Sequence, residues 1–240
     1  KKAVLCEKAF ALNLTQASEM IALAKQERVF LMEAFWTKFL PQYNKVMELI
    51  ATNVIGEVKW LQADFGFQAP APPAQRLFDP LLGGGSLLDV GIYPVFLALS
   101  VLGKPHAIQA AIIPFETGVD EQCVINFSYA GGAVASLSSS FAVDTPVEAV
   151  IAGTKGRILW RNRFHNAISE IELVLDKNPP VKIDVIREGG YGYQFEARHV
   201  GECLQQRLIE SPVMTWQDTI TLMETLDAIR RVCGIHYPVD

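Results

Sequence analysis

The sequence predicts a short α/β unit followed by an α+β domain with a large, mostly antiparallel open sheet. The first 34 residues have a strand–helix–strand pattern, which is typical of a βαβ unit. From about residue 106 the hydrophobic period changes to two residues, and the turns between the candidate strands are short. Short connections favour antiparallel pairing. We therefore divide the chain into residues 1–34 and residues 35–240.

In the first part, residues 3–6 and 29–32 are short apolar runs typical of parallel strands. Between them, Asn13 and Gln16 form a capping pattern, and an apolar stripe predicts a helix over about 14–26. These three elements make one βαβ unit.

In the second part, helical spacing predicts a helix over 37–52, and alternation predicts a strand over 58–67. A proline-rich loop at 70–73 and three glycines at 83–85 precede a helix that runs to about residue 99. The last two helices are predicted over about 192–209 and 216–232, and Thr215 with Asp218 caps the second. Between these helical regions the candidate strands are 106–115, 121–129, 133–143, 147–151, 157–161, 168–175 and 181–186.

One face of the predicted sheet carries small and polar side chains. In the strand over 121–129, Gln122 and Asn126 lie on this face, and Ser136, Ser138 and Ser140 continue it on the next strand. Such a face allows close approach of a second sheet, so we expect a homodimer through it. Simple solvation of the face is the alternative.

Composition and charge exclude several classes of function. The chain has 21 Lys and Arg against 26 Asp and Glu, a net charge of −5, which argues against nucleic acid as a partner. The uncharged stretch over 122–143 contains five serines and two adjacent glycines, so we interpret it as a hairpin and not as a membrane span. The first residues lack the apolar stretch of an export signal, and the four cysteines show no C-x-x-C spacing. We expect a cytoplasmic protein that does not act at a membrane.

Lys8 is the first candidate for chemistry. It follows Glu7 at the carboxyl end of the first predicted strand, the edge at which ligands gather in open α/β sheets. A lysine there can donate to a substrate oxygen and lower the pKa of a neighbour. An ordinary solvated loop lysine is the alternative.

Asp89 and Tyr93 form the second candidate pair. They lie four residues apart after the three glycines and share one face of an otherwise apolar helix. An aspartate and a phenol in this arrangement can orient a substrate and exchange a proton, whereas a capped helix with a core tyrosine is the alternative. The spacing of the glycines matches neither G-x-G-x-x-G nor a P-loop.

Aromatic residues at the ends of elements form a third set, which suits an apolar or sugar-stacking pocket. Ordinary core packing is the alternative for each of them. No metal is predicted, because the histidines lack metal-ligand spacing. The aromatic set is Phe35, Trp36, Phe65, Phe67, Trp160, Tyr191 and Tyr193, of which Trp36, Phe67 and Trp160 are the pocket candidates; the histidines are His106, His165, His199 and His236.

Residues 4–13, 32–41, 55–58 and 83–94 together resemble the glucose-fructose oxidoreductase/inositol dehydrogenase (GFO/IDH/MocA) family of NAD(P)-dependent oxidoreductases. Within it, the resemblance is to the dimeric dihydrodiol dehydrogenase branch. This family begins with a Rossmann unit that carries a glycine-rich fingerprint, which this sequence does not contain. The resemblance implies that residues 1–34 are the C-terminal remnant of the dinucleotide-binding domain. It also implies that most of the cofactor site precedes Lys1, and that residues 35–240 form the substrate-binding and oligomerisation domain.

The resemblance also implies roles for the candidate residues. Hydride would pass between NADP or NAD and a carbinol carbon of a cyclic diol or sugar, while Tyr93 exchanges the hydroxyl proton. Lys8 would hold the reacting oxygen and lower the pKa of Tyr93, and Asp89 would orient the substrate or Lys8. Glu7 and Lys8 would contact the cofactor, and the three aromatic candidates would line the substrate pocket. Two alternatives stay open: an NAD-assisted glycosidase of the same superfamily, and a non-catalytic oligomerisation or substrate domain.

Overall fold

The predicted strand–helix–strand unit is present at the start of the chain. The computed structural model describes residues 1–70 and 75–240; Pro72 and Pro73 of the predicted loop lie outside these residues. Strands β1 (Val4–Glu7) and β2 (Leu31–Ala34) pair in parallel and are joined by α1 (Leu14–Glu27). The Asn13 side chain accepts the Gln16 N–H at 2.9 Å, which confirms the predicted cap.

The predicted helix over 37–52 is divided into two elements. A 3₁₀-helix, η1 (Trp36–Phe39), comes first, and α2 (Pro41–Ala51) follows it. Leu40 between them has an extended backbone, with φ −70° and ψ 139°. Pro41 explains the break, because its ring disfavours a helical conformation at the preceding residue while suiting the first position of a new helix.

The remaining strands form one large mixed sheet in the order β10-β9-β8-β7-β3-β6-β5-β4. Neighbouring strands are antiparallel, except that β3 and β6 are parallel. The expected mostly antiparallel sheet is therefore a mixed sheet, because β3 comes from earlier in the chain and lies between two series of consecutive strands. The strands are β3 (Val58–Gly66), β4 (Ala107–Pro114), β5 (Asp120–Ser128), β6 (Val134–Ser140), β7 (Ala149–Gly153), β8 (Gly156–Arg161), β9 (Glu170–Leu175) and β10 (Val181–Ile183).

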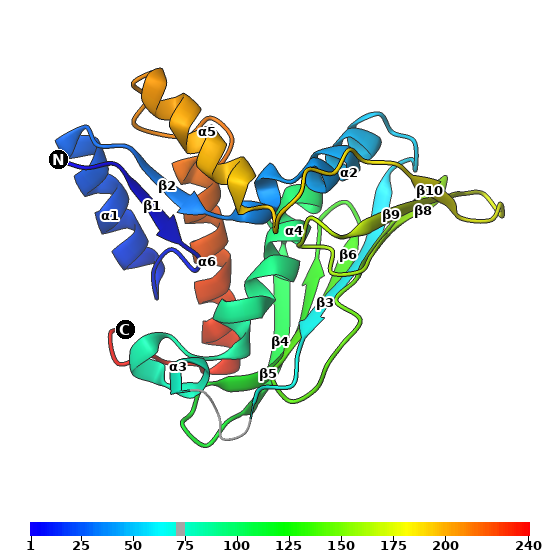
Figure 1. Ribbon diagram of the computed structural model, residues 1–240. Helices are drawn as coiled ribbons and strands as arrows, with labels where there is room; N and C mark the ends of the chain where they lie inside the picture. Colours follow the sequence, from blue (N-terminus) through cyan, green and yellow to red (C-terminus); the bar gives the residue numbers. More distant parts are fainter. Residues whose placement is uncertain (71–74) are drawn as a thin grey trace.

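Helices α4 (Ile92–Leu102) and α6 (Trp216–Cys233) lie on one side of the sheet (Figure 1). Helix α6 contacts β4, α4 and α1, so it connects the first unit to the large sheet. Helix α5 (Tyr193–Gln205) packs against η1, and α3 (Gln75–Phe78) and η2 (Pro80–Leu82) precede the segment that leads into α4.

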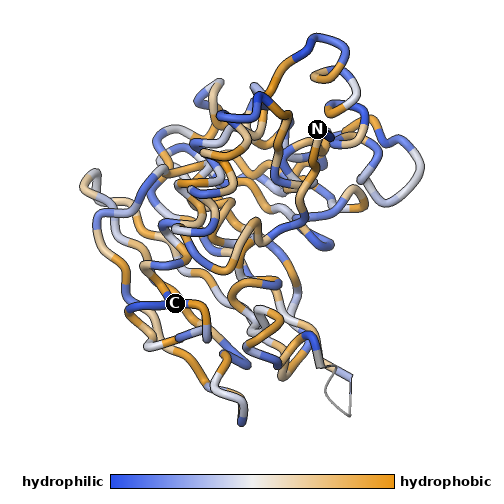
Figure 2. The backbone as a smooth tube through the Cα atoms, turned by 90° about the vertical axis from the view of Figure 1, so that its left-hand side faces the viewer, coloured by the Kyte–Doolittle hydropathy of each residue, from blue (hydrophilic) through white to orange (hydrophobic). Residues whose placement is uncertain are grey.

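The two faces of the sheet differ as the alternation predicted. On β5, Cys123, Ile125 and Phe127 are each 1% exposed, whereas Val124 between them is 54% exposed. The buried face belongs to a hydrophobic core that also contains side chains of the first unit. Hydrophobic stretches accordingly run through both parts of the molecule (Figure 2).

The segment Pro80–Leu102 is long and apolar enough to cross a membrane by length and composition. In the structure 72% of its most apolar window is buried inside the protein. Its apolar surface is thus covered by the fold itself, as in the core helix of a soluble protein.

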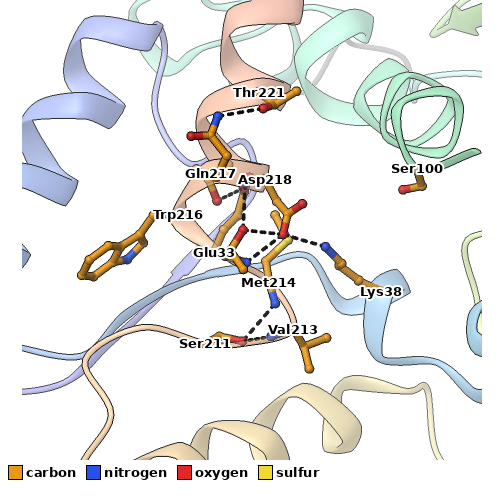
Figure 3. Close-up of polar contacts among 12 residues, drawn as sticks. Glu33, Lys38, Ser100, Ser211, Val213, Met214, Trp216, Gln217, Asp218 and Thr221 are labelled. Carbon is orange, nitrogen blue, oxygen red and sulfur yellow. Dashed lines mark hydrogen bonds and ion pairs between the residues drawn. The ribbon is translucent and has the colours of Figure 1, made fainter. Parts of the chain in front are cut away.

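The start of α6 carries the predicted capping box. The Thr215 side chain accepts the Asp218 N–H at 3.1 Å, and Asp218 accepts the Thr215 N–H at 2.9 Å. Lys38 of η1 donates to the same carboxylate at 2.8 Å (Figure 3). The cap thereby also ties α6 to the segment that follows β2.

Candidate active site

The structure brings Lys8 and Asp89 together. Lys8 follows β1, and its Nζ donates to the Asp89 backbone oxygen at 2.5 Å and lies 3.3 Å from Asp89 Oδ1. The two side chains are only 14% and 16% exposed, so solvent screens their interaction weakly. Arg76, which is exposed and was not predicted, donates to the same Oδ1 at 3.1 Å. The Asp89 carboxylate therefore pairs with two basic side chains, of which Lys8 is largely buried and Arg76 is exposed.

Asp89 lies in an irregular turn that precedes α4. Residues Leu87–Gly91 form a π-helix, η3, a feature that the sequence analysis did not predict and that often occurs at functional sites. In a π-turn the donor to a carbonyl stands five residues later, and five residues after Asp89 stands Pro94, which has no N–H. The Asp89 carbonyl is thus able to accept the Lys8 ammonium.

Tyr93, one helical turn after Asp89, lies beside Lys8. It is 7% exposed, and the Lys8 Nζ lies 5.1 Å from the centre of its ring. The Trp36 indole N–H donates to the Tyr93 hydroxyl at 2.9 Å. This bond occupies an oxygen lone pair and fixes the phenol, while the hydroxyl hydrogen has no protein acceptor within the described residues.

The pKa of Tyr93 is raised by burial, and the hydrogen bond from Trp36 offsets only part of that rise. Asp89, Glu7 and Tyr193 raise it further. The expected lowering of this pKa by Lys8 is therefore wrong for this structure, because desolvation of a phenolate outweighs nearby favourable charge. Tyr93 is a neutral phenol at neutral pH, the form that donates a proton.

An aromatic wall surrounds the phenol. Phe35 and Phe65 have ring centres 5.3 and 5.6 Å from that of Tyr93, and Tyr193 stacks on Trp36 at 4.5 Å. His165, also missed by the sequence analysis, lies 4.9 Å from Tyr93 and stacks on Phe65 at 4.2 Å.

His165 is held neutral in this wall. Burial lowers its pKa to about 3, and the charges of Arg163 and Lys8 act in the same direction. Only the three-dimensional structure shows that His165 belongs to the site, because a loop histidine without metal-ligand spacing has no feature in the sequence that marks it as functional.

Two of the three aromatic candidates lie elsewhere. Phe67 packs against Phe141 at 5.1 Å, just beyond the end of β3. Trp160 is fully buried in β8, where its indole N–H donates to Ser169 Oγ at 2.9 Å. Of the predicted pocket residues, the structure places Trp36 in contact with Tyr93.

Buried carboxyl groups lie close to this site. Glu33 of β2 stands opposite Cys6 and is 1% exposed, and Thr219 of α6 donates to its Oε2 at 2.9 Å. Burial raises its pKa to about 7, although Thr219 and Lys8 counteract the rise. Burial, together with the charge of Glu7, likewise raises the pKa of Glu196, in the first turn of α5, to about 7.

The arrangement suits acid–base chemistry at a substrate oxygen. A neutral phenol with an uncommitted hydrogen can protonate an oxyanion, and an adjacent ammonium can stabilise the charge that develops on that oxygen. Both groups lie at the carboxyl end of a parallel strand pair, where α/β proteins bind their ligands. The fold and the site together suit an enzyme that acts on a hydroxyl or carbonyl group.

Comparison with known proteins identifies the family. Residues 43–159 match the model of the GFO/IDH/MocA C-terminal domain. A trans-1,2-dihydrobenzene-1,2-diol dehydrogenase from Xenopus laevis is 37% identical over 246 residues, which cover 99% of this chain and 73% of that protein. The enzyme of the same name from Homo sapiens is 34% identical over 247 residues, covering 100% of this chain and 72% of that protein. The chain belongs to the GFO/IDH/MocA family of oxidoreductases.

Solved structures show the same fold. An aldose-aldose oxidoreductase from Caulobacter crescentus, complexed with glycerol, has a TM-score of 0.87 at 24% identity; 97% of this chain and 70% of that chain are covered. A 3-ketoreductase from Actinomadura kijaniata, in complex with NADP and TDP-benzene, has a TM-score of 0.84 at 22% identity, with 97% and 71% covered. The mixed sheet and its helices are therefore the fold of this family.

The buried carboxyl groups predict that lowering the pH stabilises the protein. The pKa values of Glu33 and Glu196 are raised from 4.5 to about 7, and that of Asp120 from 3.8 to about 6. Between the unfolded and folded pKa values the native state holds protons that the unfolded chain releases, so the free energy of unfolding rises as pH falls through this window. Below about pH 6.5 His165 opposes the effect, because the unfolded chain then takes up a proton that the folded protein excludes. The lowered pKa of Asp218 changes the free energy of unfolding only at pH values below this window.

Thermal unfolding followed by circular dichroism between pH 8 and 5.5 checks this prediction. We expect the melting temperature to rise by a few degrees, since about 1 kcal/mol corresponds to about 2–4 °C for a chain of this size. Glu33→Gln should flatten the profile. A melting temperature that falls steadily over the same range would contradict the prediction.

Proposed function

We propose that this chain carries the catalytic acid–base machinery of an NAD(P)-dependent oxidoreductase that transfers hydride between nicotinamide and a carbinol carbon of a cyclic diol or sugar. The observation that carries the proposal is the contact of Lys8 with Asp89 beside the buried hydroxyl of Tyr93. In the proposed reaction Tyr93 gives a proton to, or takes one from, the substrate oxygen. Lys8 stabilises the charge on that oxygen, and Asp89 holds Lys8 in place.

The residues present fit a nicotinamide cofactor. Glu7 ends the exposed strand β1 and Lys8 follows it, and β2 runs parallel beside β1, so the cofactor would approach the edge where these two side chains lie. When bound, the nicotinamide ring gives or accepts the hydride. We favour NADP over NAD, in keeping with the bound NADP of the 3-ketoreductase, although a levoglucosan dehydrogenase of this fold is described with NADH.

A ring-shaped substrate fits the aromatic wall. Stacked Trp36 and Tyr193 offer flat apolar faces, which suit the apolar side of a sugar or of a dihydrodiol ring. The names of the curated relatives, trans-1,2-dihydrobenzene-1,2-diol dehydrogenases, favour a cyclic diol and favour dehydrogenation over glycoside hydrolysis.

We also propose the division of the chain that the resemblance implied. Residues 1–34, with two parallel strands and their connecting helix, would be the C-terminal part of a dinucleotide-binding domain. Residues 35–240 would bind substrate and form the subunit interface, and the family match falls within this part. The four cysteines are free, which suits the reducing cytoplasm that we propose as its location.

The open face of the large sheet is the proposed homodimer interface. Trp60, Val124 and Val134 are 37%, 54% and 44% exposed on adjacent strands, and Ser136 and Asn126 lie between them. These strands border a hollow of about 510 Å³. An exposed apolar surface on a sheet face is typical of a subunit interface.

Replacing Tyr93 with Phe in the full-length protein tests the proton-transfer role. We expect the turnover number to fall by about 10²-fold or more, because a positioned general acid or base is lost. The free energy of unfolding should change by only about 1 kcal/mol, the value of one hydrogen bond. Steady-state kinetics with NADP and a trans-dihydrodiol, and melting curves on the same sample, give both quantities.

Tyr43→Phe is the matched control, because Tyr43 is also 7% exposed but its ring lies against Phe96, outside the site. It should keep near-normal turnover. Near-normal turnover of Tyr93→Phe with a lowered melting temperature would remove Tyr93 from the catalytic residues.

Lys8→Met tests the ammonium while keeping an apolar side chain of similar length. We expect turnover to fall by about 10²-fold or more, because the charge on the substrate oxygen loses its stabilising partner. Lys38→Met is the control: Lys38 is also paired with an aspartate and lies 5.8 Å from an aromatic ring centre, but its partner is Asp218 in the first turn of α6. Equal losses of turnover in the two variants would contradict a specific role for Lys8.

Light scattering at micromolar concentration tests the interface, and we expect a dimer. Val124→Glu places a charge on the exposed face of β5 and should give a monomer. Ile186→Glu is the control, because Ile186 is 87% exposed and lies outside the strands. A wild-type monomer, or a Val124→Glu dimer, would overturn the proposed interface.

A further inference from the structure

The helical segment that carries Asp89 and Tyr93 is capped by a residue from another element. The side chain of Ser86, which precedes η3, makes no cap hydrogen bond to its own helix. Asp120, the first residue of β5, accepts the Leu87 N–H at 2.6 Å and the Ser86 hydroxyl at 2.7 Å through its Oδ2. A strand residue thus satisfies groups that the start of a helix leaves without partners.

Ser139 of β6 extends this contact. Its Oγ lies 2.8 Å from Ser86 Oγ. An ionised carboxylate only accepts hydrogen bonds, so the single hydroxyl hydrogen of Ser86 goes to Asp120, and Ser139 must donate to Ser86. The charge of Asp120 therefore fixes the direction of both bonds.

Two glycines allow the helix to sit directly on the strands. A Cβ atom at Gly85, where φ is +116°, would lie 2.4 Å from Asp120 Oδ1. A Cβ atom at Gly91 would lie 2.9 Å from Ser139 Oγ. These close approaches leave little freedom for the turn to shift along the sheet.

We propose that Asp120 is a positioning residue for the reaction: with Ser86 and Ser139, it fixes the start of the helix so that Asp89 meets Lys8 and Tyr93 meets Trp36. This inference rests on the proposed function, because it assigns the chemistry to Tyr93 and Lys8. Asp120 and Ser86 are each 0% exposed and Ser139 is 3% exposed, so the contact excludes water. An error of about 1 Å in such a support can cost a large factor in rate.

The buried charge gives the contact a pH dependence. Burial raises the pKa of Asp120 to about 6, although the donors from Ser86 and Leu87 counteract the rise. The titratable groups that face it are Cys123 on its own strand, Cys233 of α6 and Tyr237 of the C-terminal segment, and all three pKa values are raised. They keep their protons through the range in which Asp120 titrates. Protonation of Asp120 removes its negative charge and so weakens the hydrogen bond from Ser86, although a carboxyl oxygen can still accept.

Two substitutions of Asp120 separate positioning from general stability. Asp120→Ala removes the acceptor, and we expect the turnover number to fall by about tenfold to a hundredfold with a much smaller change in KM. Asp120→Asn keeps an acceptor oxygen and cannot ionise. It should keep a turnover between those of Asp120→Ala and the wild type at pH 8, and its pH profile should lack the part of the acid limb that titrates near pH 6.

Asp64→Ala is the matched control. Asp64 lies on β3 and accepts the backbone N–H groups of Val147 and Glu148 at 2.8 and 3.3 Å, away from the helix. It should lower the melting temperature without lowering turnover. Equal losses of turnover in Asp64→Ala and Asp120→Ala would show a stability effect and overturn the proposal.

Amide hydrogen exchange gives a second readout that needs no activity. We expect faster exchange over residues 86–93 in Asp120→Ala and in the milder Ser139→Ala, with Asp64→Ala unchanged there. If Tyr93→Phe keeps its turnover, the proposed function fails, and exchange still decides whether Asp120 holds the helix. Wild-type exchange in both variants would overturn the proposal.

Discussion

The contact between Lys8 and Asp89 is the interaction on which the site depends, because it joins two separately built parts of the molecule. Lys8 comes from the loop after β1, and its place is set by the parallel pairing with β2. Asp89 comes from a helix that rests on the large sheet. Helix α6 contacts α1 on one side and α4 and β4 on the other, so its packing sets the distance between the two parts. The ammonium and the carboxylate meet only when all of these contacts are made.

Local patterns were sufficient to predict most of the elements. The first turns of α1 and α6 leave backbone N–H groups without partners, which favours a side chain that can accept hydrogen bonds at each N-terminus, so the caps at Asn13 and Thr215 are visible in the sequence. The alternation of buried and exposed side chains on β5 was likewise predictable, because only one face of the sheet is covered. The place of β3 was not predictable, since the pairing partner of a strand that lacks a short connection is decided by packing elsewhere in the chain. The mixed character of the sheet follows from that one insertion.

The site was predictable where its residues form short motifs. Lys8, Asp89 and Tyr93 stand out because charged or polar groups interrupt apolar segments at defined spacings. Arg76 and His165 were missed, because they reach the site from segments far from the other site residues in the sequence, whereas Tyr193 belonged to the predicted aromatic set. Trp160 was misassigned for the converse reason: an aromatic residue near the end of a strand looks the same whether it lines a pocket or fills the core.

Burial, more than charge pairing, sets the resting state of this site. Desolvation keeps Tyr93 protonated even with an ammonium near its ring, and it keeps His165 neutral. The resting site is therefore prepared to donate a proton, as the reduction of a carbonyl requires. Oxidation of an alcohol requires the phenolate, which a buried tyrosine forms only in a more basic medium or when further positive charge comes close. Because the hydrogen bond from Trp36 favours the phenolate, it reduces the free-energy difference between the two forms, and the same tyrosine can serve both directions.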